Sequence, residues 1–178
     1  MPQSGTIGIK LAGNQQTKPR RAAILVCSDR AYSGERPDRS GATLRQRLCD
    51  LGWQVSQPQI LPDDLETIAT WLKEKSAGGE YDLLLTSGGT GLAERDVTPE
   101  ATLRVIQRRV PGLEEAMRAQ SAKITPHAML SRAVAGVAGR TLIVNLPGSE
   151  RGGLDCLQVI EPALEHSAAL LRGEKPDS

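Results

Sequence analysis

Glycine and hydroxyl residues stand close together at one place in the sequence, as Ser87, Gly88, Gly89, Thr90 and Gly91. Glycine lacks a Cβ, so its backbone can take positive φ values and bring N–H groups close to a bound phosphate. We therefore expect positive φ at these glycines, with the serine and threonine hydroxyls as further donors. The pattern predicts an anion-binding turn, although a tight strand-to-helix connection favours the same residue types without any ligand.

A carboxylate, Asp96, follows this glycine turn. A carboxylate beside a phosphate would repel it unless a cation lay between the two, which favours a phosphate site with magnesium. Thr98 is suited to the N-cap and Pro99 to the first position of the next helix, whose free N–H groups would face the same turn. A structural turn in which Asp96 only caps the backbone explains the same residues, so the residue pattern leaves both interpretations open.

Apolar runs that alternate with helical patterns predict the elements that position this turn. We expect strands at residues 21–27, 53–60, 81–86, 134–137 and 141–146. We expect helices near residues 44–51, 65–77, 99–106 and 112–123, and a long helix from residue 149 onward. Asp63 should cap the second helix, and Pro162 should kink or split the last one. The alternation implies an α/β fold with a mostly parallel, doubly wound sheet, in which the last two strands form a short antiparallel hairpin.

The loops at the carboxyl ends of parallel strands are where such sheets bind ligands. Three polar loops should meet there, at residues 28–41, 62–64 and 87–96, and the loop at 145–149 joins them if its strand is parallel. Two common nucleotide motifs are missing. Glu94 stands where a G-x-G-x-x-G pattern requires glycine, and no Gly-Lys-Ser/Thr sequence follows the turn.

The composition limits the classes of function. The chain has 178 residues and a net charge of +1, which fits one domain and gives no strong field for nucleic acid or an anionic membrane. Aromatic residues make up only 2%, too few for platforms that stack single-stranded bases. No apolar segment is long enough to span a bilayer or to act as a signal. We expect a cytoplasmic protein with one domain at residues 20–172 and flexible tails at 1–19 and 173–178.

Cysteine and histidine indicate neither a disulfide framework nor a metal site. Cys27, Cys49 and Cys156 are widely spaced and form no C-x-x-C pair, as is typical of reduced thiols. His127 and His166 have no ligand spacing with each other or with a cysteine. No serine lies in a G-x-S-x-G elbow, so we assign no covalent nucleophile.

Several motifs form an ordered set along the chain: Ser28-Asp29-Arg30 with Ser33-Gly34, Leu61-Pro62-Asp63, the glycine turn through Arg95-Asp96-Val97-Thr98-Pro99-Glu100, Leu130-Ser131-Arg132 and Asn145-Leu146-Pro147-Gly148. In this order they resemble the molybdenum cofactor biosynthesis family, which includes bacterial molybdopterin adenylyltransferases and the G domain of gephyrin. The likeness extends from residue 21 to residue 171, which covers almost the whole predicted domain.

The resemblance implies a three-layer α/β fold, commonly a homotrimer, that binds molybdopterin and Mg-ATP. It implies transfer of AMP to the terminal phosphate of molybdopterin, release of pyrophosphate, and hand-over of the product to a molybdenum insertion protein. By the family pattern, Asp63 and Asp96 are the catalytic carboxylates and the magnesium ligands, while the glycine turn holds phosphate. The resemblance gives the further binding positions as Ser131, Asn145, Pro147, Gly148 and Ser149.

Other interpretations of these residues stay open. Residues 36–39 differ from the family pattern, and the family includes proteins without activity, so a non-catalytic molybdopterin-binding or scaffold protein is the alternative to an enzyme. Asp63 alone could be a helix cap. Asp29 could only shape its loop, and Arg95 could be an exposed arginine rather than a contact of the triphosphate.

Overall fold

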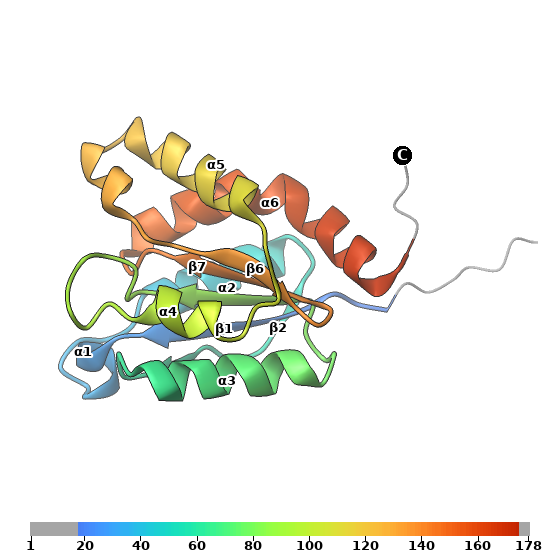
Figure 1. Cartoon of the computed structure of the whole chain (residues 1–178), viewed down its shortest axis with the longest axis horizontal. Helices are drawn as coiled ribbons and strands as arrows, with labels where there is room; N and C mark the ends of the chain where they lie inside the picture. Colours follow the sequence, from blue (N-terminus) through green and yellow to red (C-terminus); the bar gives the residue numbers. More distant parts are fainter. Residues whose placement is uncertain (1–17, 175–178) are drawn as a thin grey trace, which may run out of the picture.

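The computed structural model describes residues 18–174 and has three layers, a central sheet with helices on both faces (Figure 1). Its strands are β1 (Arg21–Cys27), β2 (Gln54–Val55), β3 (Gln59–Leu61), β4 (Leu83–Ser87), β5 (Arg108–Arg109), β6 (Ala135–Ala138) and β7 (Thr141–Leu146). They form one seven-stranded sheet in the order β2, β1, β4, β7, β6, β5, in which β3 also pairs with β1. Pairs among β1, β2, β3, β4 and β7 are parallel, whereas β6 is antiparallel to both β7 and β5. The predicted α/β fold with a mostly parallel sheet and a small antiparallel element is confirmed.

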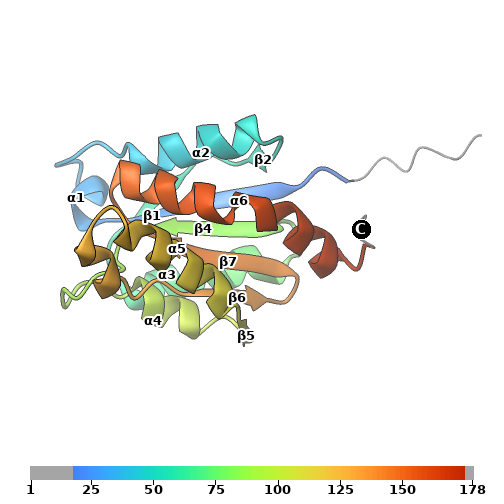
Figure 2. The same cartoon turned by 90° about the horizontal axis from the view of Figure 1, so that it is seen from above.

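The helices cover both faces of this sheet. They are α1 (Asp29–Tyr32), α2 (Ser40–Asp50), α3 (Leu65–Ala77), α4 (Thr98–Leu103), α5 (Pro111–Ala122), the 3₁₀ helix η1 (Pro126–Leu130) and α6 (Glu150–Arg172). Helices α2, α5 and α6 contribute to one apolar core, and α3 and α4 contribute to the other. Figure 2 shows α2, α6 and α5 spread over the same face of the sheet.

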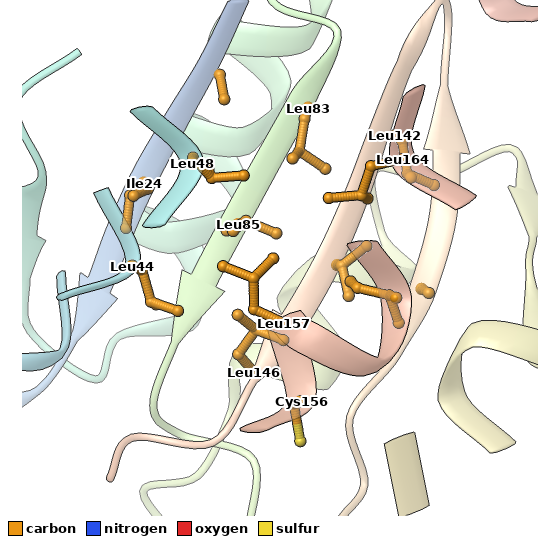
Figure 3. Packing of buried hydrophobic residues seen from close by; sticks show 14 of the residues in the cluster. Ile24, Leu44, Leu48, Leu83, Leu85, Leu142, Leu146, Cys156, Leu157 and Leu164 are labelled. Atoms are coloured by element: carbon orange, nitrogen blue, oxygen red, sulfur yellow. The ribbon is translucent and has the colours of Figure 1, made fainter. Parts of the chain in front are cut away.

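Residues of the central strands alternate between these two cores. In β4, Leu83 and Leu85 belong to the core beneath α2 and α6, and Leu84 belongs to the core beneath α3. Figure 3 shows the first core, in which Leu157 of α6 and Leu48 of α2 approach the strands. Because both faces are covered, the strands are continuous apolar runs rather than alternating ones.

The strand expected at residues 53–60 is interrupted in the structure. β2 ends at Val55 and β3 begins at Gln59, and Pro58, which has no N–H for a ladder bond, lies between them. The two-residue β5 was not expected, because a pair of arginines carries no strand pattern.

Two helix caps are shifted by one residue from the positions we expected. Asp64, not Asp63, caps α3, since its side chain accepts a hydrogen bond from the Thr67 N–H at 2.9 Å. The N-cap of α4 is Val97, and Thr98 is the first residue of that helix. Asp63 and the Thr98 hydroxyl are therefore not used as caps and are available for other contacts.

Pro162 does not divide α6, which is one helix from Glu150 to Arg172. Proline removes one hydrogen bond of the helix. However, α6 packs into the core on both sides of the proline, through Leu157 and Ile160 before it and Leu164 after it. These contacts hold the helix together, so of the two expected outcomes, a kink or a split, the split was wrong.

The two ends of the described chain meet at the amino ends of the strands. Arg172 donates to both oxygens of Asp82 at 2.6 and 2.7 Å, and it also donates to the carbonyl oxygens of Lys18 and Pro19. Residues 1–17 and 175–178, which make up most of the predicted flexible tails, lie outside the described residues. Within residues 18–174 no helix combines the length and the apolar character that crossing a bilayer requires.

The first prediction concerns the Arg172–Asp82 ion pair, whose side chains are only 13% and 10% exposed. Arg172→Ala should lower the free energy of unfolding by about 3 kcal/mol, because it leaves a carboxylate nearly buried without its partner. Urea unfolding followed by circular dichroism measures this loss. The control is Arg151→Ala, since that side chain is 88% exposed; equal losses in the two variants would contradict the prediction.

Candidate functional site

Four segments meet at the carboxyl ends of parallel strands, at the left of Figure 1. β1, β3, β4 and β7 run parallel to one another, so the residues that follow them leave the same edge of the sheet. These segments are residues 28–39, 62–64, 88–97 and 147–149. The fourth loop joins the other three because its strand, β7, is parallel to β4.

The glycine turn follows β4 directly. Gly88 has a φ of +107° and Gly89 a φ of +63°, left-handed values that glycine adopts without strain. Gly91 does not have a positive φ, so our expectation was wrong for this residue. Its missing side chain instead makes room for Asp96, whose Oδ2 lies 2.7 Å from the point that a Cβ would occupy.

Close packing beneath the turn also requires glycine. A Cβ on Gly88 would overlap the carbonyl oxygen of Cys27 at the end of β1. A Cβ on Gly89 would overlap the Thr98 hydroxyl and lie 3.2 Å from Asp63 Oδ1. The turn is thus held directly against the end of β1 and the Asp63 carboxylate.

Some backbone N–H groups of the turn donate hydrogen bonds within the protein, and others do not. The Gly88 N–H donates to a carbonyl oxygen of β7 at 3.0 Å and is occupied. No hydrogen bond within residues 18–174 uses the N–H groups of Gly89, Thr90 or Gly91. The carbonyl oxygens of Thr90 and Gly91 accept bonds from the Arg132 backbone and side chain, which fixes the turn with those N–H groups unused.

The structure brings the two predicted carboxylates to this turn, Asp63 beside Gly89 and Asp96 beside Gly91. Asp96 Oδ2 also accepts a hydrogen bond from the Ala93 N–H at 2.9 Å, as expected if this side chain caps the backbone. Asp63 Oδ1 is buried and has no hydrogen-bond partner within the described chain. Burial is the main cause that raises the pKa of Asp63, and the charges of Asp29 and Asp96 raise it further. An orphaned carboxylate oxygen of this kind is suited to bind a cation.

Asp29 supports Asp63, a contact that the sequence did not indicate. The Asp29 N–H donates to Asp63 Oδ2, and the Asp63 N–H donates to Asp29 Oδ1, both at 3.0 Å. Arg95 donates to both oxygens of Asp29 at 2.7 to 3.0 Å, and this hydrogen bonding lowers the pKa of Asp29. Asp29 and Arg95 are 66 positions apart, so only their places in adjoining motifs could have linked them.

A cavity of about 540 Å³, here named the polar cavity, opens on the Gly88–Gly89 side of the turn. Its lining includes Ser28, Arg36, Arg39, Ser40 and Gly148. Helix α2 begins at this cavity, where Asp38 accepts bonds from the Ser40 hydroxyl and the Gly41 N–H. Ser87 also reaches Ser40, its hydroxyl donating to Ser40 Oγ at 3.0 Å. The guanidinium groups of Arg36 and Arg39 favour phosphate groups in this cavity, whereas the carboxylates of Asp38 and Glu150 in the same lining oppose them.

A second cavity of about 290 Å³, here named the apolar cavity, opens on the Thr90–Gly91 side. Its walls include Met117, Ala128, Leu130, Ala133, Pro147 and Cys156. Ser131 and His127 add polar groups to this lining. Apolar walls with a few polar groups are typical of sites for small organic molecules. The glycine turn therefore contributes residues to both cavities.

The remaining predicted binding residues divide between these cavities. Gly148 lines the polar cavity, whereas Ser131, Pro147 and Ser149 line the apolar one. Ser149 also caps α6, its hydroxyl accepting a bond from the Gly152 N–H at 3.2 Å. Their roles toward a ligand stay predictions.

Asn145 contributes to the apolar cavity from a fully buried position at the end of β7. Its amide nitrogen donates to the hydroxyls of Thr86 and Thr102 at 2.9 and 2.8 Å. Its Oδ1 accepts a bond from the Val134 N–H at 3.1 Å. The side chain thus ties together β4, α4 and the start of β6, a structural task that the sequence did not reveal.

The domain has three α/β layers, and its glycine turn and two carboxylates adjoin two cavities at the carboxyl ends of the strands. This layout is typical of α/β proteins that bind small molecules. Residues 23–166 match the family described as the probable molybdopterin binding domain, and the chain belongs to this family. The resemblance recognised from the motifs is confirmed.

Individual relatives agree with this assignment. The chain is 38% identical over 152 residues to the molybdopterin adenylyltransferase of Helicobacter pylori strain J99, an alignment that covers 84% of this chain and 86% of that protein. It is 40% identical over 154 residues to the molybdenum cofactor biosynthesis bifunctional protein of Chlorobaculum tepidum. That match covers 86% of this chain but 49% of the relative, so the chain spans about half the length of that protein.

A solved structure has the same fold. The molybdopterin biosynthesis enzyme MoaB from Thermus thermophilus superimposes with a TM-score of 0.82 at 44% sequence identity. The superposition covers 88% of this chain and 98% of that one. The architecture described above is therefore that of the family.

The second prediction is that Gly89→Ala impairs anion binding. The added Cβ would overlap the Thr98 hydroxyl and strain a left-handed residue, which moves the unused N–H groups of the turn. Pyrophosphate affinity, measured by isothermal titration calorimetry, should fall by about tenfold, the loss expected from one or two misplaced hydrogen bonds. Gly112→Ala is the control, since a Cβ there meets no atom within 4 Å. Unchanged affinity in Gly89→Ala would be inconsistent with a binding role.

The third prediction concerns Cys27, which lines the polar cavity but is only 3% exposed. Burial raises the pKa of its thiol to about 12, so the thiol stays protonated at pH 8. Alkylation by iodoacetamide at pH 8, followed by mass spectrometry, should modify the partly exposed Cys49 first. Cys27 and the buried Cys156 should react only after unfolding, and rapid labelling of Cys27 in the folded protein would disprove its protection.

Proposed function

We propose that this protein is a molybdopterin adenylyltransferase, which transfers AMP from ATP to the terminal phosphate of molybdopterin and releases pyrophosphate. The observation that carries this proposal is the placement of Asp63 and Asp96 against a turn that contributes to two cavities. A transfer between two substrates needs two binding sites that meet at the reacting atoms. The name of the Helicobacter pylori relative, molybdopterin adenylyltransferase, supports the same assignment.

We assign the polar cavity to ATP and the apolar cavity to the pterin. Arg36 and Arg39 line the polar cavity, and their guanidinium groups favour a triphosphate. The apolar cavity offers walls such as Met117 and Leu130 to a flat ring and the Ser131 hydroxyl to its polar edge. The unused N–H groups of the turn would hold the acceptor phosphate between the two substrates.

The carboxylates fit a magnesium ion. Asp63 presents a buried oxygen without a partner, and Mg²⁺ in nucleotide sites is commonly held by one or two carboxylates together with substrate phosphates. Within residues 18–174 no group of three or more His, Cys, Asp and Glu side chains could hold a metal ion alone. We therefore expect Asp63 and Asp96 to bind the ion only in cooperation with ATP. When bound, the ion supplies positive charge between the phosphates.

The chemistry requires no base from the protein. An oxygen of the pterin phosphate, already anionic, attacks the α-phosphorus of ATP, and the bond from that phosphorus to the β-phosphate oxygen breaks. Bringing the two sets of phosphates together costs several kcal/mol in a cleft of low dielectric constant, by an order-of-magnitude estimate. The arginines of the polar cavity and the N–H groups of the turn reduce this cost and align the attacking oxygen.

Further expectations from the family are part of the same proposal. We propose a homotrimer, which size-exclusion chromatography with light scattering can test, and hand-over of the adenylated product to a molybdenum insertion protein. We also propose a cytoplasmic location. The three cysteines are all free, as expected in a reducing compartment.

The fourth prediction is that Asp96→Asn abolishes AMP transfer but keeps pterin binding. The variant removes one charge from the cation site and leaves the unused N–H groups of the turn in place. The rate should fall by roughly a hundredfold or more. A single-turnover assay with molybdopterin, ATP and Mg²⁺, read out as adenylated pterin and pyrophosphate, measures the transfer.

The control for this prediction is Asp64→Asn, which changes the acid beside Asp63. Asparagine caps helices as well as aspartate does, so α3 and the rate should be unaffected. Normal transfer by Asp96→Asn would refute the role of that carboxylate. Pterin binding without any product in the wild-type protein would instead support the non-catalytic molybdopterin-binding or scaffold alternative.

A further inference from the structure

We propose that Asp29 and Arg95 are positioning residues, which set the relative placement of Asp63 and Asp96. This inference rests on the proposed function, because it takes those two carboxylates as the ligands of a divalent cation. It adds two residues that act through the carboxylates rather than as ligands of the cation.

Asp29 orients the Asp63 carboxylate. The Asp29 N–H holds Asp63 Oδ2, and the Asp63 N–H is held in turn by Asp29 Oδ1, both at 3.0 Å. The first bond holds the Asp63 carboxylate through Oδ2, and the second holds the Asp63 backbone against the Asp29 side chain. Because Oδ2 is occupied, Oδ1 is the oxygen that is buried beside Gly89 without a partner. Asp29 therefore determines which oxygen of Asp63 is presented to a cation.

Arg95 connects Asp29 to the segment that carries Asp96. Arg95 precedes Asp96 in the chain, and its guanidinium donates hydrogen bonds to both carboxylate oxygens of Asp29. On the other side, Arg132 donates to the Asp96 carbonyl oxygen and to the Gly91 carbonyl oxygen. The segment that carries Asp96 is thus tied both to the support of Asp63 and to the glycine turn. A change at Arg95 would alter the spacing between the two carboxylates.

The Arg95–Asp29 pair contributes little to the stability of the fold. The side chains of Arg95 and Asp29 are 62% and 45% exposed, and ion pairs as exposed as this one add little to folding stability. The geometry is nevertheless specific, since a planar guanidinium that contacts both carboxylate oxygens fixes an orientation that a lysine cannot reproduce. Such a pair is suited to placement rather than to stability.

Two explanations of Arg95, as a neighbouring charge or as a positioning residue, predict opposite changes in cation affinity when this residue is removed. Removing a positive charge near a cation site should, by its electric field alone, strengthen the binding of a divalent cation. Loss of positioning should weaken it. The direction of the change therefore distinguishes a positioning residue from a mere neighbouring charge.

The fifth prediction uses Mn²⁺ as a paramagnetic probe of the cation site, measured by electron paramagnetic resonance in the presence of saturating α,β-methylene-ATP. In Arg95→Ala the dissociation constant for Mn²⁺ should rise by about tenfold or more, the effect typical of residues that orient a metal ligand. Arg95→Lys should recover only part of the affinity, because it keeps the charge but loses the planar fork. Pterin affinity and the melting temperature should stay close to wild type in both variants.

The matched control is Arg104→Ala, which removes a surface ion pair with Glu66 whose side chains are similarly exposed, at 53% and 77%. Its Mn²⁺ affinity should equal that of wild type. Unchanged or tighter Mn²⁺ binding in Arg95→Ala would overturn the positioning role while leaving the cation site intact. If wild type and Asp63→Asn bind Mn²⁺ equally, the carboxylates are not ligands, and the proposed function fails at that point.

Discussion

The backbone contact at Gly88 is the constraint on which the site depends. The Gly88 N–H donates to the Leu146 carbonyl oxygen at the end of β7, and its Cα faces the Cys27 carbonyl oxygen at the end of β1. A Cβ on Gly148, in the loop after β7, would lie 3.0 Å from the same Cα. The ends of three parallel strands are thus in contact at one residue that cannot carry a side chain. This contact fixes where the turn leaves the sheet, and the turn separates the two cavities.

The electrostatics of the site follow from that packing. Asp29, Asp63 and Asp96 come from three different segments, and the charges of Asp29 and Asp96 both raise the pKa of Asp63. Arg95 compensates one of these acids through its pair with Asp29 and leaves Asp63 Oδ1 unpaired. A buried carboxylate oxygen without a partner is costly in the empty protein. A bound divalent cation would remove that cost, so the same arrangement that destabilises the empty site favours the loaded one.

The sequence predicted that Asp63 and Asp96 lie at the same edge of the sheet, because this prediction needs only the order of the strands and helices. Parallel strands place their carboxyl ends at one edge, whatever the details of packing. The sequence did not predict features that depend on one particular residue or on a contact between distant segments. Asp64 caps α3 in place of Asp63 because only the observed backbone shows which side chain faces the Thr67 N–H. The Asp29–Arg95 pair depends on how two loops fold over the sheet edge, and no periodic pattern encodes such a contact.

The internal hydrogen bonds of Asn145 limit which ligand groups this side chain could contact. Both of its amide hydrogens are donated to buried threonine hydroxyls, and one lone pair of Oδ1 accepts the Val134 N–H. An amide offers two donors and two acceptor positions, so a ligand in the apolar cavity would find only one acceptor position free. Any direct recognition by Asn145 must therefore be of a donor group, such as an N–H on the edge of a ring. The network that holds β7 against β4 and α4 thus also limits which edge of a heterocycle the residue can face.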